Sequence, residues 1–149
     1  MKKSVWLILF LLGGNLLSAC SAGQNVTILN TPTMGTEGVR PEPPAEFADM
    51  KNPYKTDDED ALNKGEALYR ANCSSCHGEQ GLGDGPAGAS LNPKPGNLAR
   101  DQANLSDAYL FWRISEGGIL EPFNSLMPAW KALMSEQQIW QVITYIRTF

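Results

Sequence analysis

The chain has 149 residues, with 12 Lys and Arg against 16 Asp and Glu, and its formal net charge is −4 at pH 7. This acidic balance gives no support to a nucleic-acid partner, for which a clustered basic surface is the usual mark. The chain holds three cysteines and one histidine, so a tetrahedral zinc site would need all of them.

The N-terminus has the pattern of a bacterial secretory signal. Lysines at the start are followed by a bulky apolar run over residues 5–12, which is the order found in signal peptides. The run is shorter than the roughly 20 residues of a transmembrane anchor, the alternative for this segment. It leads to Leu17–Cys20 (LSAC), which resembles the lipobox of bacterial lipoproteins. We therefore predict a lipoprotein signal peptide over residues 1–19 and lipidation of Cys20.

Lipidation of Cys20 would also determine the cellular location of the mature protein. Cleavage after Ala19 removes two lysines and moves the formal charge from −4 to −6. The predicted place is the bacterial cell envelope, on the exported side, with the chain lipid-anchored to a membrane and facing the periplasm or another extracytoplasmic space. Ser21 rather than Asp follows the cysteine, which mildly disfavours retention at the inner membrane and leaves the choice of membrane open.

Residues 20–56 are predicted to form a flexible, Pro-rich linker. The segment mixes proline with Gly, Thr, Asn and Glu and has no lasting helical or strand period. Its prolines are Pro32, Pro41, Pro43, Pro44 and Pro53. A pure spacer rarely carries large apolar side chains, so Phe47, Met50 and Tyr54 are expected to pack either on the following domain or on a partner subunit.

Residues 57–149 are expected to fold as one small all-α domain. The first helix begins at an acidic run over residues 57–60, whose carboxylates suit a cap and the positive end of a helix. Gly65, Leu68 and Tyr69 then share one face of this helix, which runs into Cys73.

The chain next reaches Cys73-Ser74-Ser75-Cys76-His77, which has the attachment signature of a c-type haem. Each thiol adds to one haem vinyl group, and the adjacent histidine becomes an axial ligand of the iron. A redox-active dithiol and part of a zinc site are the alternatives. A redox-active dithiol of the thioredoxin type would stand in a βαβ pattern, which the sequence does not show. A zinc site would also need Cys20, which is assigned to lipidation. We therefore predict one haem c, covalently attached through Cys73 and Cys76 and ligated by His77.

Loops and two further helices follow the haem motif. The Gly-rich segment 78–86 has neither a preceding strand nor the Lys-Ser/Thr of a phosphate-binding loop, and is expected to let the backbone pass close to the haem. Ser106 is expected to cap a middle helix that ends at Gly117. Ser135 and Gln138 form a capping-box pattern at the start of the last helix.

The sixth ligand of the iron is expected to be Met127. The chain has no second histidine, which excludes bis-His ligation within a monomer. The other methionines lie in the signal peptide, in the linker or at the apolar position before the last helix. They are Met1, Met34, Met50 and Met134. Met127 remains, in a loop directly before Pro128.

Residues 57–149 resemble the class I cytochromes c, small all-α proteins that wrap one covalent haem. The likeness rests on a haem motif at the end of the first helix, a Met-Pro loop and an aromatic-aliphatic pair that begins at Tyr145. Gly65 and Tyr69 match the family's spacing before the first cysteine, where these residues meet the last helix. In the family a proline carbonyl accepts the histidine Nδ1–H and orients the ring. The resemblance assigns that role to Pro95, with Pro93 as the alternative.

The resemblance implies an electron-transfer protein and not an enzyme. A His/Met-ligated haem would carry one electron in a respiratory or photosynthetic chain, with a membrane quinol oxidoreductase, a terminal oxidase or a reaction centre as redox partners. The first alternative is a fixed monohaem subunit of a terminal oxidase or of a larger quinol oxidoreductase resembling alternative complex III. The second is a haem sensor or peroxidase, although no distal His or Arg motif suggests one.

Overall fold

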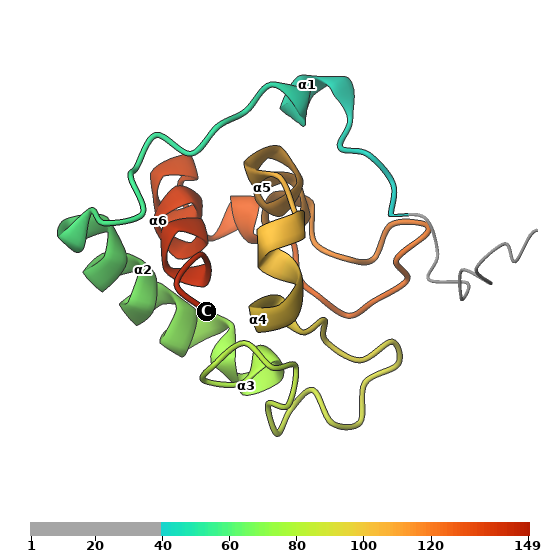
Figure 1. Ribbon diagram of the computed structural model, residues 1–149. Helices are drawn as coiled ribbons and strands as arrows, with labels where there is room; N and C mark the ends of the chain where they lie inside the picture. The colour runs from blue at the N-terminus through green and yellow to red at the C-terminus, as the bar shows by residue number, and fades with distance from the viewer. Residues whose placement is uncertain (1–39) are drawn as a thin grey trace, which may run out of the picture. The chain divides into compact units, whose positions relative to one another are not determined.

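The computed structural model describes residues 40–149, and the segment drawn in grey in Figure 1 lies outside this range. The predicted signal peptide, Cys20 and the first part of the predicted linker therefore lie outside the described residues. Within residues 40–149, no helix has the length and apolar character needed to cross a membrane.

Over the described range the chain is helical and has no strand, which confirms the all-α expectation. Three longer helices carry the fold, and the shorter ones lie on the segments before and between them (Figure 1). In chain order the elements are α1 (Ala45–Ala48), α2 (Glu59–Asn72), α3 (Ser74–His77), α4 (Leu98–Asp101), η1 (Gln102–Asn104), α5 (Asp107–Glu116), η2 (Trp130–Ala132) and α6 (Glu136–Ile146).

Helices α2 and α6 cross closely at Gly65, as the sequence predicts. A Cβ at this position would collide with the backbone carbonyl of Gln141 in α6, so only glycine permits the approach. Tyr69 is fully buried at the crossing, and its ring centroid lies 5.5 Å from that of Tyr145. Its hydroxyl donates a hydrogen bond of 2.8 Å to the carbonyl of Gly78. The crossing thereby ties the end of α2 to the loop after the haem motif.

The main helices begin at the residues that the sequence predicts as caps. The Asp58 carboxylate accepts a backbone N–H at the start of α2, and the Ser106 hydroxyl does so at the start of α5. Ser135 and Gln138 form the complete capping box of α6, with side-chain to backbone hydrogen bonds in both directions. Helix α5 ends at Glu116, and the next residue, Gly117, has a φ of +72°, which favours glycine.

The core lies where α5 and α6 pack together and against the inner face of α2. Phe111 of α5 stacks on Trp140 of α6 with ring centroids 4.3 Å apart. Buried aliphatic side chains recur along α6 with the spacing of one helical face. They are Ile139, Val142, Ile143 and Ile146.

Residues 40–54, called the N-terminal strap below, pack against this domain although their composition predicts a flexible linker. The strap belongs to the same compact unit as the helices. Phe47 in α1 lies with its ring centroid 6.3 Å from that of Phe111, and Met50 and Tyr54 pack on the same core. Of the two places left open for these apolar side chains, the domain itself is the one observed.

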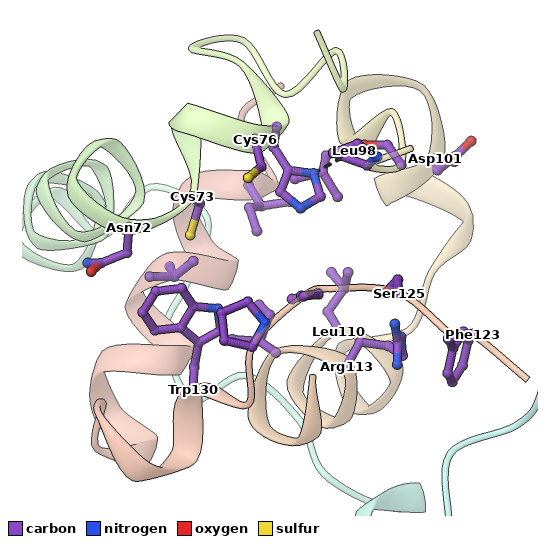
Figure 2. A pocket seen from close by; sticks show the side chains of 18 of the residues that line it. Asn72, Cys73, Cys76, Leu98, Asp101, Leu110, Arg113, Phe123, Ser125 and Trp130 are labelled. Atoms are coloured by element: carbon purple, nitrogen blue, oxygen red, sulfur yellow. Dashed lines mark hydrogen bonds between the residues drawn. The ribbon is translucent and has the colours of Figure 1, made fainter. Parts of the chain in front are cut away.

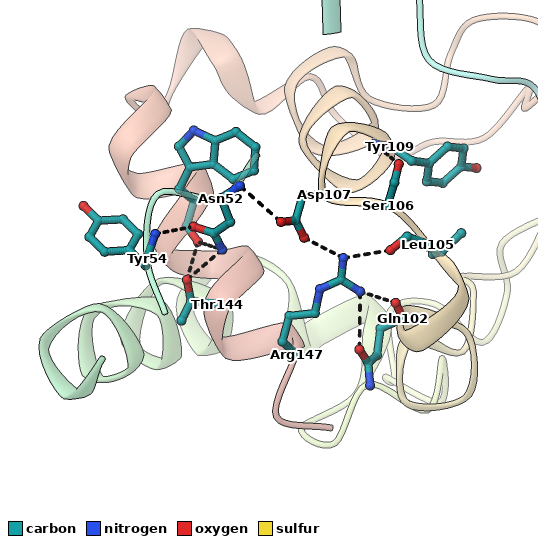
Figure 3. Close-up of polar contacts among 10 residues, drawn as sticks. Asn52, Tyr54, Gln102, Leu105, Ser106, Asp107, Tyr109, Thr144 and Arg147 are labelled. Carbon is teal, nitrogen blue, oxygen red and sulfur yellow. Dashed lines mark hydrogen bonds and ion pairs between the residues drawn. The ribbon is translucent and has the colours of Figure 1, made fainter. Parts of the chain in front are cut away.

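Polar contacts also fasten the strap to α5 and α6 (Figure 3). The backbone N–H of Asn52 donates to the Asp107 carboxylate at 3.1 Å, and its side-chain amide donates to the Thr144 hydroxyl at 2.9 Å. Asp107 also pairs with Arg147, at the end of α6, over 2.6 Å. One carboxylate therefore joins the strap, the start of α5 and the end of α6.

Candidate haem site

A cavity of about 500 Å³ lies between α3, the loop that follows it, α5 and the loop before η2 (Figure 2). This volume is within the usual range of about 300–1,000 Å³ for cofactor and small-molecule sites. Its apolar walls include Leu98, Leu110, Ile114, Val142 and Ile146. The predicted haem residues Cys73, Cys76, His77 and Met127 all line it. Residues that lie far apart in the sequence thus meet at one cavity.

The two motif cysteines are positioned by the junction of α2 and α3. Cys73 directly follows α2, and its carbonyl accepts the N–H groups of Cys76 at 3.1 Å and His77 at 2.9 Å. Burial, with a smaller contribution from Cys76, raises the pKa of the Cys73 thiol to about 12. The Cys73 thiol therefore stays protonated near neutral pH.

The His77 ring is oriented by a backbone carbonyl of the Pro-rich loop. Its Nδ1 lies 3.2 Å from the carbonyl oxygen of Gly96. Because a carbonyl can only accept, Nδ1 carries the hydrogen and Nε2 keeps its lone pair for a metal. Burial lowers the pKa of His77, and the hydrogen bond to Gly96 acts in the opposite direction. A lowered pKa favours a neutral imidazole.

This contact corrects the expected acceptor. The sequence assigns that role to Pro95, or alternatively to Pro93, and both prolines line the cavity. The carbonyl of Pro95 packs against Gly83 instead, which leaves the next carbonyl, that of Gly96, to meet the imidazole.

Met127 is placed by the loop that joins α5 to η2. Gly118 N–H donates to the carbonyl of Met127 at 2.9 Å, and Ser125 N–H donates to the carbonyl of Gly118 at 2.7 Å, so the loop closes on itself. Of the other methionines in the described range, Met134 is buried in the core and Met50 packs on it. Met1 and Met34 lie outside the described residues. Met127 is the methionine that lines the cavity within residues 40–149.

Arg113 is a cavity residue that sequence reasoning missed. Its guanidinium donates to the Gly117 carbonyl at 2.5 Å and lies 3.3 Å from the centroid of the Phe123 ring. Burial lowers the pKa of Arg113, and within residues 40–149 it forms no ion pair with a carboxylate. A guanidinium remains charged in such surroundings. The only signal in the sequence was one arginine among the apolar residues of α5.

These residues fit a covalently bound c-type haem. The cavity offers thiols from adjacent turns, an imidazole with its Nε2 lone pair available, a thioether and apolar walls, which together are what such a haem requires. The Arg113 guanidinium adds a positive charge that suits an anionic group of the cofactor.

Comparison with known proteins identifies the family of the domain independently of the cavity. The model of the family described as "Cytochrome C oxidase, cbb3-type, subunit III" matches residues 60–146. This range covers the haem motif, α6 and every residue that lines the cavity except Arg40.

Two curated relatives are similar to the chain. Cytochrome c-L of Methylorubrum extorquens is 30% identical over 116 residues, which are 77% of this chain and 54% of that protein. The cytochrome c subunit of the quinone alcohol dehydrogenase of Gluconobacter oxydans is 31% identical over 90 residues, which are 57% of this chain and 18% of that protein. The chain therefore spans about half of the first relative and about a fifth of the second.

Solved structures agree with the fold. Cytochrome cL from the marine methylotroph Methylophaga aminisulfidivorans has a TM-score of 0.50 at 23% identity, over 78% of this chain and 71% of that chain. A chain of the reducing HAO-like protein complex of Kuenenia stuttgartiensis has a TM-score of 0.53 at 20% identity, over 75% of this chain and 52% of that chain. With the family match, the shared fold and the residues gathered at the cavity, the chain belongs to the cytochrome c family described by the cbb3-type subunit III model, whose members bind haem c covalently and transfer electrons.

Proposed function

We propose that the chain is a monohaem, class I-type one-electron carrier with His77 and Met127 as axial ligands and thioether bonds at Cys73 and Cys76. The observation that carries the proposal is the meeting of these residues at one apolar cavity. We propose further that the protein works in a respiratory or photosynthetic electron-transfer chain.

Bound haem supplies an iron that gains and loses one electron without changing a substrate bond. The protein contributes a neutral imidazole, oriented through the Gly96 carbonyl, and a methionine whose loop is closed by backbone hydrogen bonds. His77 and Met127 would both hold the iron, so that little would need to move when an electron is gained or lost. His/Met ligation also favours a raised reduction potential.

An absorption spectrum of the matured protein tests this ligation, in the oxidised and reduced forms and with carbon monoxide. We expect a low-spin c-type spectrum with the weak long-wavelength Met–iron band, unchanged by carbon monoxide. Met127→Ala should lose that band and bind carbon monoxide. Met134→Leu, a volume-conserving change in the core, is the matched control and should keep the wild-type spectrum. A wild-type haem that binds carbon monoxide would favour the sensor or peroxidase alternative instead.

The proposal places the protein on the exported side of a bacterial envelope, held by lipid on Cys20. The support is the signal and lipobox pattern of residues 1–20, together with a covalent haem as cofactor. Cys20→Ser is expected to move the protein from the membrane to the soluble fraction. Fractionation followed by haem staining measures this, with Ser21→Ala as the control that leaves the cysteine in place. Retention of the Cys20→Ser protein in the membrane would contradict lipid as the sole attachment.

A fixed subunit of a larger oxidoreductase is the second candidate function. The family description names an oxidase subunit, and one relative is named as the cytochrome subunit of a dehydrogenase. Ile119 and Leu126, on the loop that carries Met127, are 78% and 73% exposed, which leaves apolar surface near the cavity for a partner. Mild detergent solubilisation followed by sizing separates the two candidates, since a free carrier should elute as a lone small protein.

A further inference from the structure

We infer that the N-terminal strap is part of the haem site, because it carries Arg40 to the end of the cavity that receives the haem carboxylates. The ligand of Arg40 would be a propionate group of the cofactor. This inference rests on the proposed function, since it assumes a c-type haem in the cavity. It gives the strap a binding role that a linker-like composition does not predict.

The cavity has two chemically different ends (Figure 2). Cys73 and Cys76 lie at one end, whereas Asp101, Arg113 and Phe123 lie toward the other. In haem, the vinyl groups that form thioethers and the propionate groups stand on opposite sides of the macrocycle. Because the cysteines take the vinyl side, the propionates are directed toward the end with Asp101 and Arg113.

Arg40 belongs to this second end. It lines the cavity, and a nitrogen of its guanidinium lies 3.0 Å from a carboxylate oxygen of Asp101. The Arg40 side chain is 47% exposed, whereas that of Asp101 is 17% exposed. A guanidinium has five N–H donors, and the pair with Asp101 occupies only part of them. The remaining donors are available to a second carboxylate.

The charges at this end favour a second arginine. An arriving propionate would meet Asp101, whose pKa is held below its ordinary value first by Arg100 and then by Arg40, so it stays negative. Carboxylates taken out of water need a paired positive charge. Arg113 supplies one desolvated guanidinium without a carboxylate partner in the described range. Arg100 also pairs with Asp101, at 2.6 Å, so the positive charge of Arg40 is available to a second carboxylate.

Contacts elsewhere on the strap hold Arg40 at this position. Phe47 packs on Phe111, and Asn52 is hydrogen-bonded to Asp107 and Thr144 (Figure 3). The strap is therefore fastened to α5 and α6 along its length and to the cavity at Arg40. Cofactor binding and strap docking should consequently favour each other, as any two events with a shared contact do.

The test is the midpoint potential of the purified, full-length protein in four forms: wild type, Arg40→Gln, Asp101→Asn and the double variant. A positive charge beside the haem favours reduced iron, so Arg40→Gln should lower the potential. In the Asp101→Asn background, where the carboxylate partner of Arg40 is gone, Arg40→Gln should lower it again. Arg70→Gln removes an exposed cation of α2 that pairs with Glu66, and this matched control should leave the potential unchanged.

Redox-induced infrared difference spectra give a second readout, because carboxylate bands respond to the hydrogen-bond partners of the propionates. We expect Arg40→Gln to shift these bands in the Asp101→Asn background and Arg70→Gln to leave them unchanged. Unshifted bands, or a potential in that background that does not respond to Arg40→Gln, would overturn the inference, since Arg40 would then serve Asp101 alone. A wild-type protein without a covalent low-spin haem would overturn the proposed function and, with it, the inference.

Discussion

Gly65 determines how closely α2 and α6 can approach. A methyl group at this position would overlap the backbone carbonyl of Gln141, which cannot rotate aside as a side chain can. Overpacking of a core costs about 1–3 kcal/mol and occasionally more. We expect Gly65→Ala to destabilise the protein by about 3 kcal/mol despite the better helix propensity of alanine. Urea unfolding of the oxidised protein, followed by circular dichroism, measures the change in the free energy of unfolding.

Asn63→Gln is the matched control for this prediction. Asn63 is an exposed residue of the same helix, α2, so the added methylene group points into solvent and leaves the crossing unchanged. We expect the free energy of unfolding to change by less than about 0.5 kcal/mol. Equal losses from both substitutions would show that the close crossing is not what makes Gly65 necessary.

Single residues differ in how far the sequence can predict their roles. The haem motif and Met127 follow from spacing and from the single histidine, and all of them line one cavity. The sequence predicts the acceptor for His77 one residue too early, because the choice between Pro95 and Gly96 depends on the path of a loop. Arg113 could not be predicted, since its role depends on a cavity that forms only when distant segments pack together.

At the scale of elements, the start of α6 depends on its capping box. The Ser135 hydroxyl accepts the N–H of Gln138, and the Gln138 side chain accepts the N–H of Ser135 at 2.9 Å. Loss of such a cap costs about 1 kcal/mol, and we expect this loss from Ser135→Ala in denaturant unfolding. The absorption spectrum should not change, because neither residue lines the cavity.

Thr148→Ala is the control at the opposite end of the same helix. The exposed Thr148 hydroxyl donates to the carbonyl of Tyr145 at 2.7 Å, beyond the last residue of α6. Water can replace this hydrogen bond, so we expect a loss below about 0.5 kcal/mol. A loss as large as that of Ser135→Ala would contradict a specific role for the capping box.

The sequence predicts the longer helices, but it does not predict that the strap packs on the domain. Helix ends carry local signals, such as Ser106 before α5, and helix interiors repeat their apolar residues with one period. The strap has no period, and it is held by single contacts to distant parts of the chain, such as that between Asn52 and Thr144. Composition alone therefore assigns it to the linker, although Phe47 was a local sign of packing.

At the scale of the whole molecule, the strap raises the question of where the stable domain begins. Phe47, Met50 and Tyr54 are each partly buried against the core. Full burial of a large apolar side chain contributes about 1.5–3 kcal/mol, so partial burial of these side chains should stabilise the domain by roughly 3 kcal/mol in total. The predicted domain start at residue 57 and a start at residue 40 therefore make different predictions for truncated chains.

We expect a chain that begins at residue 40 to unfold with the same free energy as the full chain, and one that begins at residue 57 to lose roughly 3 kcal/mol. Both truncated forms would follow the same cleavable signal peptide, so that haem attachment is common to them. Denaturant unfolding at one pH and oxidation state gives the comparison. The shorter form also lacks the Asn52 contact to Asp107, and protection of the α5 amides from hydrogen exchange should fall with it. Equal stability of the two forms would show that the strap lies on the domain without stabilising it and that residue 57 is the boundary after all.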